Sequence, residues 1–176
     1  ELIGHFYAAL DRLCPVAEAS VPPGGRALDV ATGTGDIALA FLASREEEGR
    51  GTEGTGQPAI IVGLDFCPPM LEIAKRKSPI PNPQSPIPVF AAGDALLLPF
   101  ADATFDAVTS GFAMRNVVDI QATFAEMRRV TWPGGRVVCL EVARPGNPLL
   151  RFLHGFYFGQ IVPILGRLVS GQGAAY

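Results

Sequence analysis

Residues 26–36 of this 176-residue chain read RALDVATGTGD, a short apolar run that ends in glycines and acidic residues. A run of apolar residues without alternation, followed by a turn, is typical of a strand buried on both faces of a parallel sheet. The glycines allow the backbone to turn sharply, and a helical pattern over 36–43 follows at once. The stretch therefore predicts a strand, a tight turn and a helix, which together open an α/β fold.

The same alternation of strand and helix patterns continues along the chain. Further strands are predicted at 59–65, 88–92, 105–110 and 136–142, and further helices at 2–14, 68–77 and 119–130. Asp119 is expected to cap its helix, and the turn Pro133-Gly134-Gly135 is expected to introduce the last strand. We expect one α/β, Rossmann-like domain over 1–176, with a mostly parallel sheet, helices on both faces, and the final strands of such a sheet absent from this chain.

Three segments depart from this pattern. Residues 44–58 are charged and rich in glycine, which favours a flexible surface loop, and 78–88 hold five prolines, which exclude a regular helix or a central strand. Residues 148–170 are apolar on nearly every side, but the longest stretch among them without a charged residue is too short to span a bilayer. The last segment is therefore expected to be a buried helix, a channel for a lipid tail or a helix at a membrane surface.

Composition excludes several classes of protein. With 48% hydrophobic residues the chain can bury a core, and a net charge of −3 gives no sign of a nucleic-acid binder. Three widely spaced cysteines and two histidines argue against a disulfide scaffold and against a metal site. The N-terminal residues carry no secretory signal pattern, so a cytoplasmic location is expected.

Polar residues follow the predicted strands, where ligands bind in an open parallel sheet. They are Asp29 to Asp36 after the first strand, Asp65 after the second, Gly93-Asp94-Ala95 after the third and Gly111 to Asn116 after the fourth. A helix N-terminus behind a glycine turn offers unpaired N–H groups, and a carboxylate after the second strand is suited to two ribose hydroxyls. These positions predict a site for a nucleotide-like cofactor.

Two such cofactors compete for this pattern. Gly33-x-Gly35-x-x-Ala38 also fits a dinucleotide fingerprint, a weak signal alone. Asp29 inside the end of the first strand, and Asp94 after the third, favour a different cofactor. Together these features resemble an S-adenosylmethionine-dependent methyltransferase.

Longer stretches narrow the resemblance. The chain resembles the ubiquinone/menaquinone biosynthesis C-methyltransferases in LDVATGTGDIALA (28–40), GLDFCPPMLEIAK (63–75), AGDALLLPFADATFDAVTSGFAMRN (92–116), FAEMRRVTWPGGRVVCLEVARP (124–145) and NPLLRFLHGFYFGQIVPILGRLVSG (147–171). This resemblance implies methylation of a ring carbon of a prenylated quinol such as demethylmenaquinol. A benzoquinol, another small molecule, or an inactive cofactor-binding module are the alternatives.

The resemblance also implies roles for individual residues. The cofactor is expected to contact Asp29, Ala31, Gly33, Thr34, Gly35, Asp65, Asp94, Ala95 and Gly111. Arg115 would hold the developing oxyanion of the acceptor, unless it merely pairs with Asp119, and Asn116 would bind a ring oxygen. Glu141 is either a structural or a site carboxylate. The prenyl tail makes contact with the inner face of a membrane through 148–170 an expectation, and a homodimer a further alternative.

Overall fold

The computed structural model describes residues 21–22, 24–47, 59–78, 87–141 and 147. The chain divides into two compact units, Glu1–Glu141 and Val142–Tyr176, and the described residues other than 147 belong to the first. The expectation of one domain over the whole chain therefore stays a prediction. The helix predicted at 2–14 and the apolar segment 148–170 lie outside the described residues.

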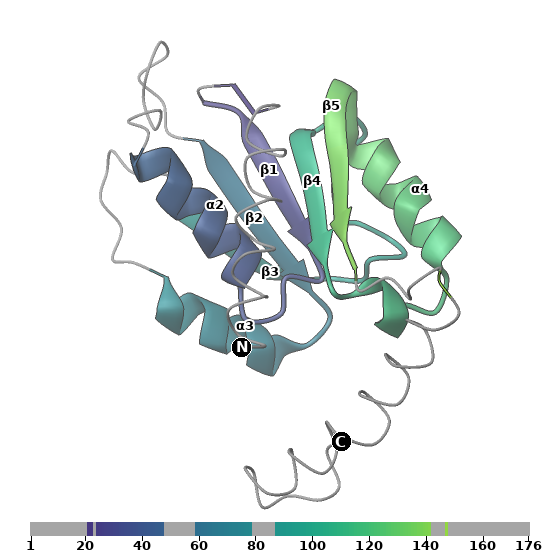
Figure 1. Cartoon of the computed structure of the whole chain (residues 1–176), viewed down its shortest axis with the longest axis horizontal. Coiled ribbons are helices and arrows are strands. Elements are labelled where there is room, and N and C mark those ends of the chain that lie inside the picture. Colours follow the sequence, from purple (N-terminus) through teal and green to yellow (C-terminus); the bar gives the residue numbers. More distant parts are fainter. Residues whose placement is uncertain (1–20, 23, 48–58, 79–86, 142–146, 148–176) are drawn as a thin grey trace, which may run out of the picture. The chain divides into compact units, whose positions relative to one another are not determined.

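The first unit contains a five-stranded parallel sheet (Figure 1). Its strands are β1 (Arg26–Val30), β2 (Ile60–Asp65), β3 (Ile87–Ala92), β4 (Phe105–Gly111) and β5 (Thr131–Leu140), in the order β3-β2-β1-β4-β5. Every neighbouring pair is parallel, which confirms the predicted sheet. The chain builds outward from β1 to β3 and then crosses to β4 on the other side of β1. Strand order therefore reverses beside β1, where an α/β sheet forms its binding crevice.

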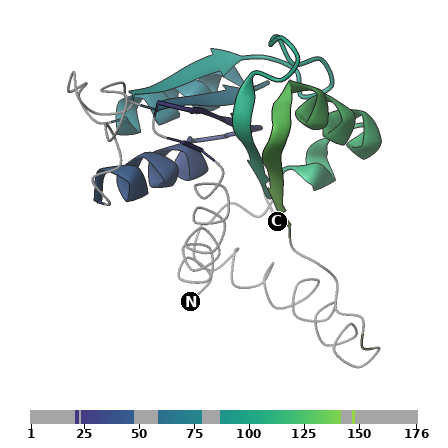
Figure 2. The same cartoon turned by 90° about the horizontal axis from the view of Figure 1, so that it is seen from above.

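Helices cover both faces of this sheet, as predicted (Figure 2). They are α2 (Asp36–Glu47), α3 (Pro68–Lys77) and α4 (Ile120–Val130), with a short 3-10 helix η1 (Met114–Asn116) after β4. Phe41 and Leu42 of α2 pack in one core cluster with Ala27, whereas Met127 of α4 packs in a second cluster with Leu28. Because neighbouring residues of a strand point to opposite faces, α2 and α4 lie on opposite sides of the sheet.

Element boundaries agree with the predictions to within one residue except in β5, which also ends at Leu140 and not at the predicted 142, and at the end of α2. Strand β5 begins at Thr131, which already pairs with Phe105, whereas Arg136 pairs with Ala107. The predicted turn around Gly134, whose φ is 95°, is therefore a bulge within the strand rather than its entrance. Helix α2 continues to Glu47, so the prediction that the loop begins at Ser44 was wrong by one helical turn. Arginine and glutamate there are good helix formers, and a helix end needs no apolar periodicity.

Candidate functional site

A cleft of about 680 Å³ opens at the carboxyl ends of the strands, within the size range of about 300–1,000 Å³ usual for small-molecule sites. Eight of the predicted site residues line it, namely Ala31, Gly33, Thr34, Asp65, Asp94, Ala95, Gly111 and Asn116. Asp29, Gly35 and Arg115 are not among the lining residues. The sheet therefore brings most of the predicted site residues together at the cleft, whereas the other three lie outside its lining.

The two glycines of the loop after β1 have different surroundings. Gly33 has φ 56°, and a Cβ added to it would meet nothing within 4 Å, so it faces the open cleft. Gly35 has φ 79°, and a Cβ there would lie 2.9 Å from Cβ of Ala74 in α3. Gly33 thus leaves room for a ligand, whereas Gly35 allows α3 to pack closely against the loop.

Asp29 lies under the loop and is 2% exposed. Its carboxylate accepts hydrogen bonds from Thr32 Oγ1 at 2.6 Å and from Thr109 Oγ1 at 2.8 Å. Burial raises the pKa of Asp29 from its ordinary value of 3.8 to about 7, although both hydroxyls oppose this rise. Asp29 therefore links the loop after β1 to β4 and sets a titratable charge directly behind the cleft.

Asp65 links the loops that follow β1 and β2. Its Oδ2 accepts from Gly33 N and its Oδ1 from Cys67 N, each at 2.8 Å. The N-cap position of α3 is occupied by Cys67 and not by Asp65. Each carboxylate oxygen can accept more than one hydrogen bond, so these contacts orient Asp65 and leave it capacity for ribose hydroxyls.

Asp94 closes a turn after β3. Its Oδ1 accepts from Leu96 N at 2.9 Å, and its carbonyl oxygen accepts from Leu97 N at 3.1 Å. The same residue and Ala95 line the cleft. The turn therefore fixes the carboxylate at the rim, where it can also accept from an amino group.

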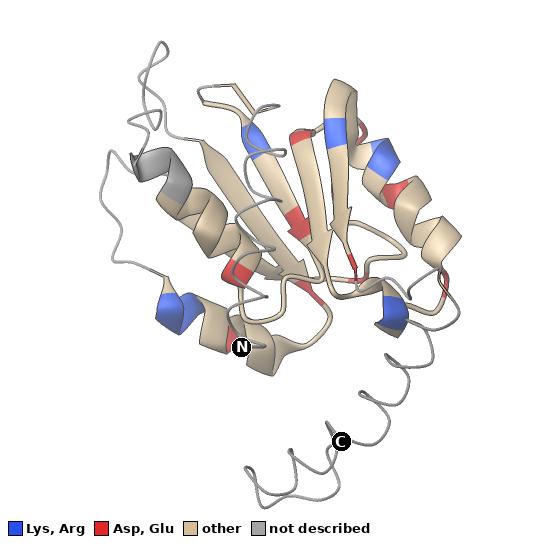
Figure 3. Cartoon of the chain, viewed as in Figure 1, with Lys and Arg blue, Asp and Glu red and all other residues tan. Residues whose placement is uncertain are grey.

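The N-terminus of α2 carries its own carboxylate. Asp36 Oδ2 accepts from Thr34 Oγ1 at 2.6 Å, and Lys77 Nζ lies 2.9 Å from Asp36 Oδ1 and 3.0 Å from Thr34 Oγ1. Among the described residues that line the cleft there are three aspartates, and neither lysine nor arginine. Acidic segments gather at this end of the sheet in Figure 3. Lys77 pairs with Asp36, but Asp65 and Asp94 leave the lining of the cleft negatively charged, which suits a cationic ligand and disfavours a pyrophosphate.

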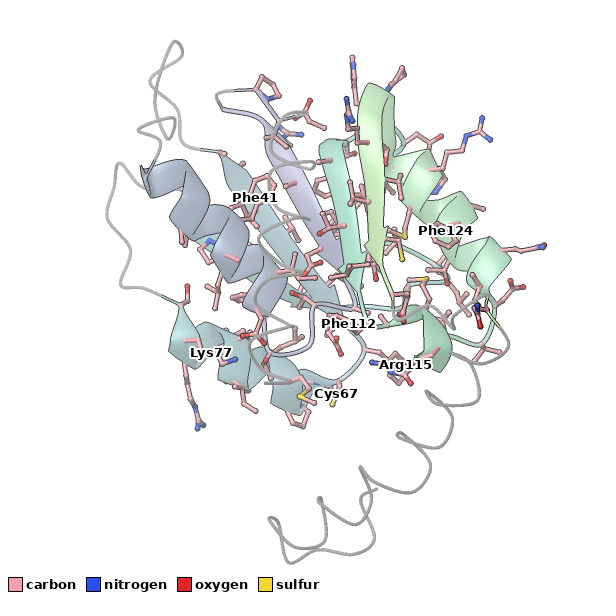
Figure 4. All side chains as sticks on the ribbon, in the orientation of Figure 1. Phe41, Cys67, Lys77, Phe112, Arg115 and Phe124 are labelled. Carbon is pink, nitrogen blue, oxygen red and sulfur yellow. The ribbon has the colours of Figure 1, made fainter. Side chains whose placement is uncertain are left out.

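The loop after β4 holds Arg115 at the surface. Its guanidinium carbon lies 5.9 Å from the centre of the Phe112 ring, and both residues are labelled in Figure 4. The alternative pairing with Asp119 is not present among the described ion pairs, since Asp119 caps α4 by accepting from Ala122 N at 2.9 Å. Asn116 faces the cleft. Of the two predicted catalytic residues, Asn116 therefore lines the cleft, whereas Arg115 lies over the ring of Phe112 and does not.

Sequence reasoning missed several residues that shape this site. Thr109 contacts Asp29 at the end of β1, 80 positions earlier, and Lys77 contacts Thr34, 43 positions earlier, so no local pattern marks either residue. Phe112 lines the cleft, but the prediction for its loop rested on polar residues and so passed over this aromatic side chain. In the part of the chain that the structure describes, no helix is long and apolar enough to cross a membrane.

The fold is that of a Rossmann-like methyltransferase. A SAM-dependent methyltransferase from Methanosarcina mazei has a TM-score of 0.60 with this chain at 22% identity, over 81% of this chain and 65% of that chain, which shows a shared fold. The chain itself belongs to the ubiE/COQ5 methyltransferase family, whose profile matches residues 14–176.

Relatives in this family carry a common name. The chain is 47% identical over 165 residues to a demethylmenaquinone methyltransferase of Roseiflexus castenholzii, which covers 94% of this chain and 63% of the relative. It is 42% identical over 151 residues to a demethylmenaquinone methyltransferase of Thermus thermophilus, over 86% of this chain and 62% of the relative. The chain therefore spans less than two thirds of the length of these relatives.

Proposed function

We propose that the chain binds S-adenosylmethionine in the cleft and transfers its methyl group to a ring carbon of a prenylated quinol, with demethylmenaquinol as the acceptor. The observation that carries the proposal is the identity of 47% to a demethylmenaquinone methyltransferase, together with the cleft at the predicted positions. A prenylated benzoquinol is the second candidate acceptor, because the family description covers both ubiE and COQ5 proteins.

The charge of the cleft supports this cofactor over a dinucleotide. S-adenosylmethionine carries a sulfonium and an ammonium group, whereas NAD carries two phosphates. The place where a dinucleotide fold would bind phosphate, the N-terminus of α2, holds Asp36. Asp29 lies behind the same loop, and its ionised form would add to the attraction for a cation.

The cofactor would extend across three neighbouring strands. Its methionine part would lie along residues 31–34, where Gly33 leaves open space. Its ribose would meet Asp65 after β2, and its adenine would meet Asp94 and Ala95 after β3. This order follows the order β1, β2, β3 in the sheet, so one extended ligand reaches all three loops.

The acceptor would lie beside the loop after β4. When bound, S-adenosylmethionine supplies an electrophilic methyl group, and a ring carbon becomes nucleophilic as a neighbouring hydroxyl loses its proton. Asn116, which faces the cleft, would hydrogen-bond a ring oxygen and so orient the ring. Arg115 carries a permanent charge on the same loop but does not line the cleft, so it would have to leave its place over the Phe112 ring to stabilise the oxyanion.

A prenylated acceptor would reach the protein from a bilayer. We therefore extend the proposal to a cytoplasmic protein that contacts the inner face of the membrane through its apolar residues 148–170. Binding of the chain to vesicles that carry the quinol, compared with vesicles that lack it, tests this part separately. Light scattering of the free chain tests the alternative that this segment forms a homodimer.

Mass spectrometry tests the proposed reaction. The chain is incubated with S-adenosylmethionine labelled as CD3 and with demethylmenaquinol or the corresponding demethylated benzoquinol, both kept reduced. We expect label on a ring carbon of the naphthoquinol. Label on the benzoquinol alone would favour the second candidate. Tight binding of S-adenosylhomocysteine without transfer to either quinol would instead support an inactive cofactor-binding module.

A further inference from the structure

The order of the strands divides the cleft into two parts. In the proposed binding mode the cofactor lies against the loops after β1, β2 and β3, which are neighbours in the sheet. The loop after β4 lies on the other side of β1 and lines the remaining part with Phe112, Ala113, Asn116 and Val117. The part of the cleft that is left for the acceptor is therefore a wall of apolar side chains with the side-chain amide of Asn116.

Phe112 adopts an unusual backbone conformation in this wall. Its φ is 56°, in the left-handed region that a residue with a bulky side chain seldom occupies. Such strained residues persist where the surrounding structure fixes them, and they cluster at functional sites. Phe112 is half-buried and lines the cleft. Its strained backbone therefore presents an aromatic surface to the space where a ligand would bind.

Two hydrogen bonds to the neighbouring end of β5 hold this conformation. Phe112 N donates to the carbonyl oxygen of Leu140 at 2.8 Å, and Met114 N donates to Oε1 of Glu141 at 2.7 Å. The second bond is charge-assisted and is therefore the stronger kind. The Glu141 carboxylate therefore anchors the backbone two residues after Phe112, and the bond to Leu140 anchors Phe112 itself.

We propose that Phe112 is the surface against which the aromatic ring of the acceptor packs, and that Glu141 is the positioning residue that holds Phe112 in place. Planar rings pack on phenylalanine in offset or edge-to-face arrangements. Asn116, four residues later on the same loop, would then meet an oxygen of the packed ring. This inference rests on the proposed function and adds the part of the cleft that would recognise the acceptor.

The test uses the full chain saturated with S-adenosylhomocysteine and titrated with 1-naphthol, a planar ring with one hydroxyl. Phe112→Leu and Glu141→Ala are expected to weaken 1-naphthol binding by about three- to tenfold, the range that aromatic pairing provides. Both are expected to leave the affinity for S-adenosylhomocysteine unchanged. Glu141→Gln is expected to restore 1-naphthol binding, because its amide oxygen still accepts from Met114 N.

Phe124→Leu is the matched control, since Phe124 lies on α4 and does not line the cleft (Figure 4). This control should leave 1-naphthol binding as in the unchanged chain. The inference is overturned if the unchanged chain fails to bind 1-naphthol, or if Phe112→Leu binds it as tightly. Equal weakening by Glu141→Gln and Glu141→Ala would remove Glu141 from the proposal. Failure to bind S-adenosylhomocysteine would contradict the proposed function instead, so the two failures are distinguishable.

Discussion

Replacement of the buried Asp29 by asparagine should change how the stability of the protein depends on pH. Asp29 is 2% exposed, and burial raises its pKa from 3.8 to about 7. Between these values the native state binds a proton that the unfolded state has released, so the free energy of unfolding falls as the pH rises. Asparagine is neutral at every pH and lacks this dependence.

The size of the effect follows from the two pKa values. At about 1.4 kcal/mol for each unit of pKa, the whole difference corresponds to about 4 kcal/mol, of which about 3 kcal/mol is lost between pH 5 and pH 8. Asp29→Asn also changes the hydrogen bonds with Thr32 and Thr109, but the part of their contribution that depends on the charge of Asp29 is already contained in its pKa. The change in the stability difference with pH therefore isolates the buried charge.

Urea unfolding of both proteins at pH 5, 6, 7 and 8 measures this difference. We expect the free energy of unfolding of Asp29→Asn to rise by about 3 kcal/mol relative to that of the unchanged chain from pH 5 to pH 8. Thr109→Val is the complementary variant, because the hydroxyl of Thr109 lowers the pKa of Asp29. Its loss should extend the fall in stability to higher pH. Parallel curves for Asp29→Asn and the unchanged chain would refute the reasoning.

Other substitutions test the loop and a helix cap. Gly35→Ala places a Cβ 2.9 Å from Ala74 at φ 79°, and should lower the free energy of unfolding by about 1–3 kcal/mol in urea titrations. Gly33→Ala adds a Cβ in open space, so it should weaken S-adenosylhomocysteine binding in calorimetry more than Gly35→Ala does. Ala31→Gly removes the strain of an alanine at φ 56° and should raise the free energy of unfolding by about 1 kcal/mol. Asp119→Ala removes the cap of α4 and should cost about 1 kcal/mol, whereas an unchanged melting temperature would deny that role.

Much of the fold could be predicted because its strands are buried and parallel. Apolar runs such as 26–31 mark such strands without ambiguity, and Pro68 and Asp119 mark two helix starts that the structure confirms. The start of β5 was missed because proline and glycine at 133–135 predict a turn, while pairing of Thr131 with Phe105 depends on a strand far away in sequence.

The candidate site divides in the same way. Residues that directly follow strands, such as Asp65 and Asp94, could be predicted, because parallel strands end at one edge of the sheet. The contacts of Lys77 with Asp36 and of Glu141 with Met114 join residues that are 41 and 27 positions apart. No spacing rule connects such pairs, so they could not be inferred from the sequence.

Calorimetric titration of the purified chain with S-adenosylhomocysteine, with NAD as the comparison at the same temperature and salt, tests the central claim most directly. The account predicts micromolar binding of S-adenosylhomocysteine and much weaker binding of NAD, because Asp36 stands at the helix N-terminus where a pyrophosphate would bind. Asp65→Ala should abolish the first signal, since it removes the acceptor for the ribose hydroxyls. Tighter binding of NAD than of S-adenosylhomocysteine would contradict the account.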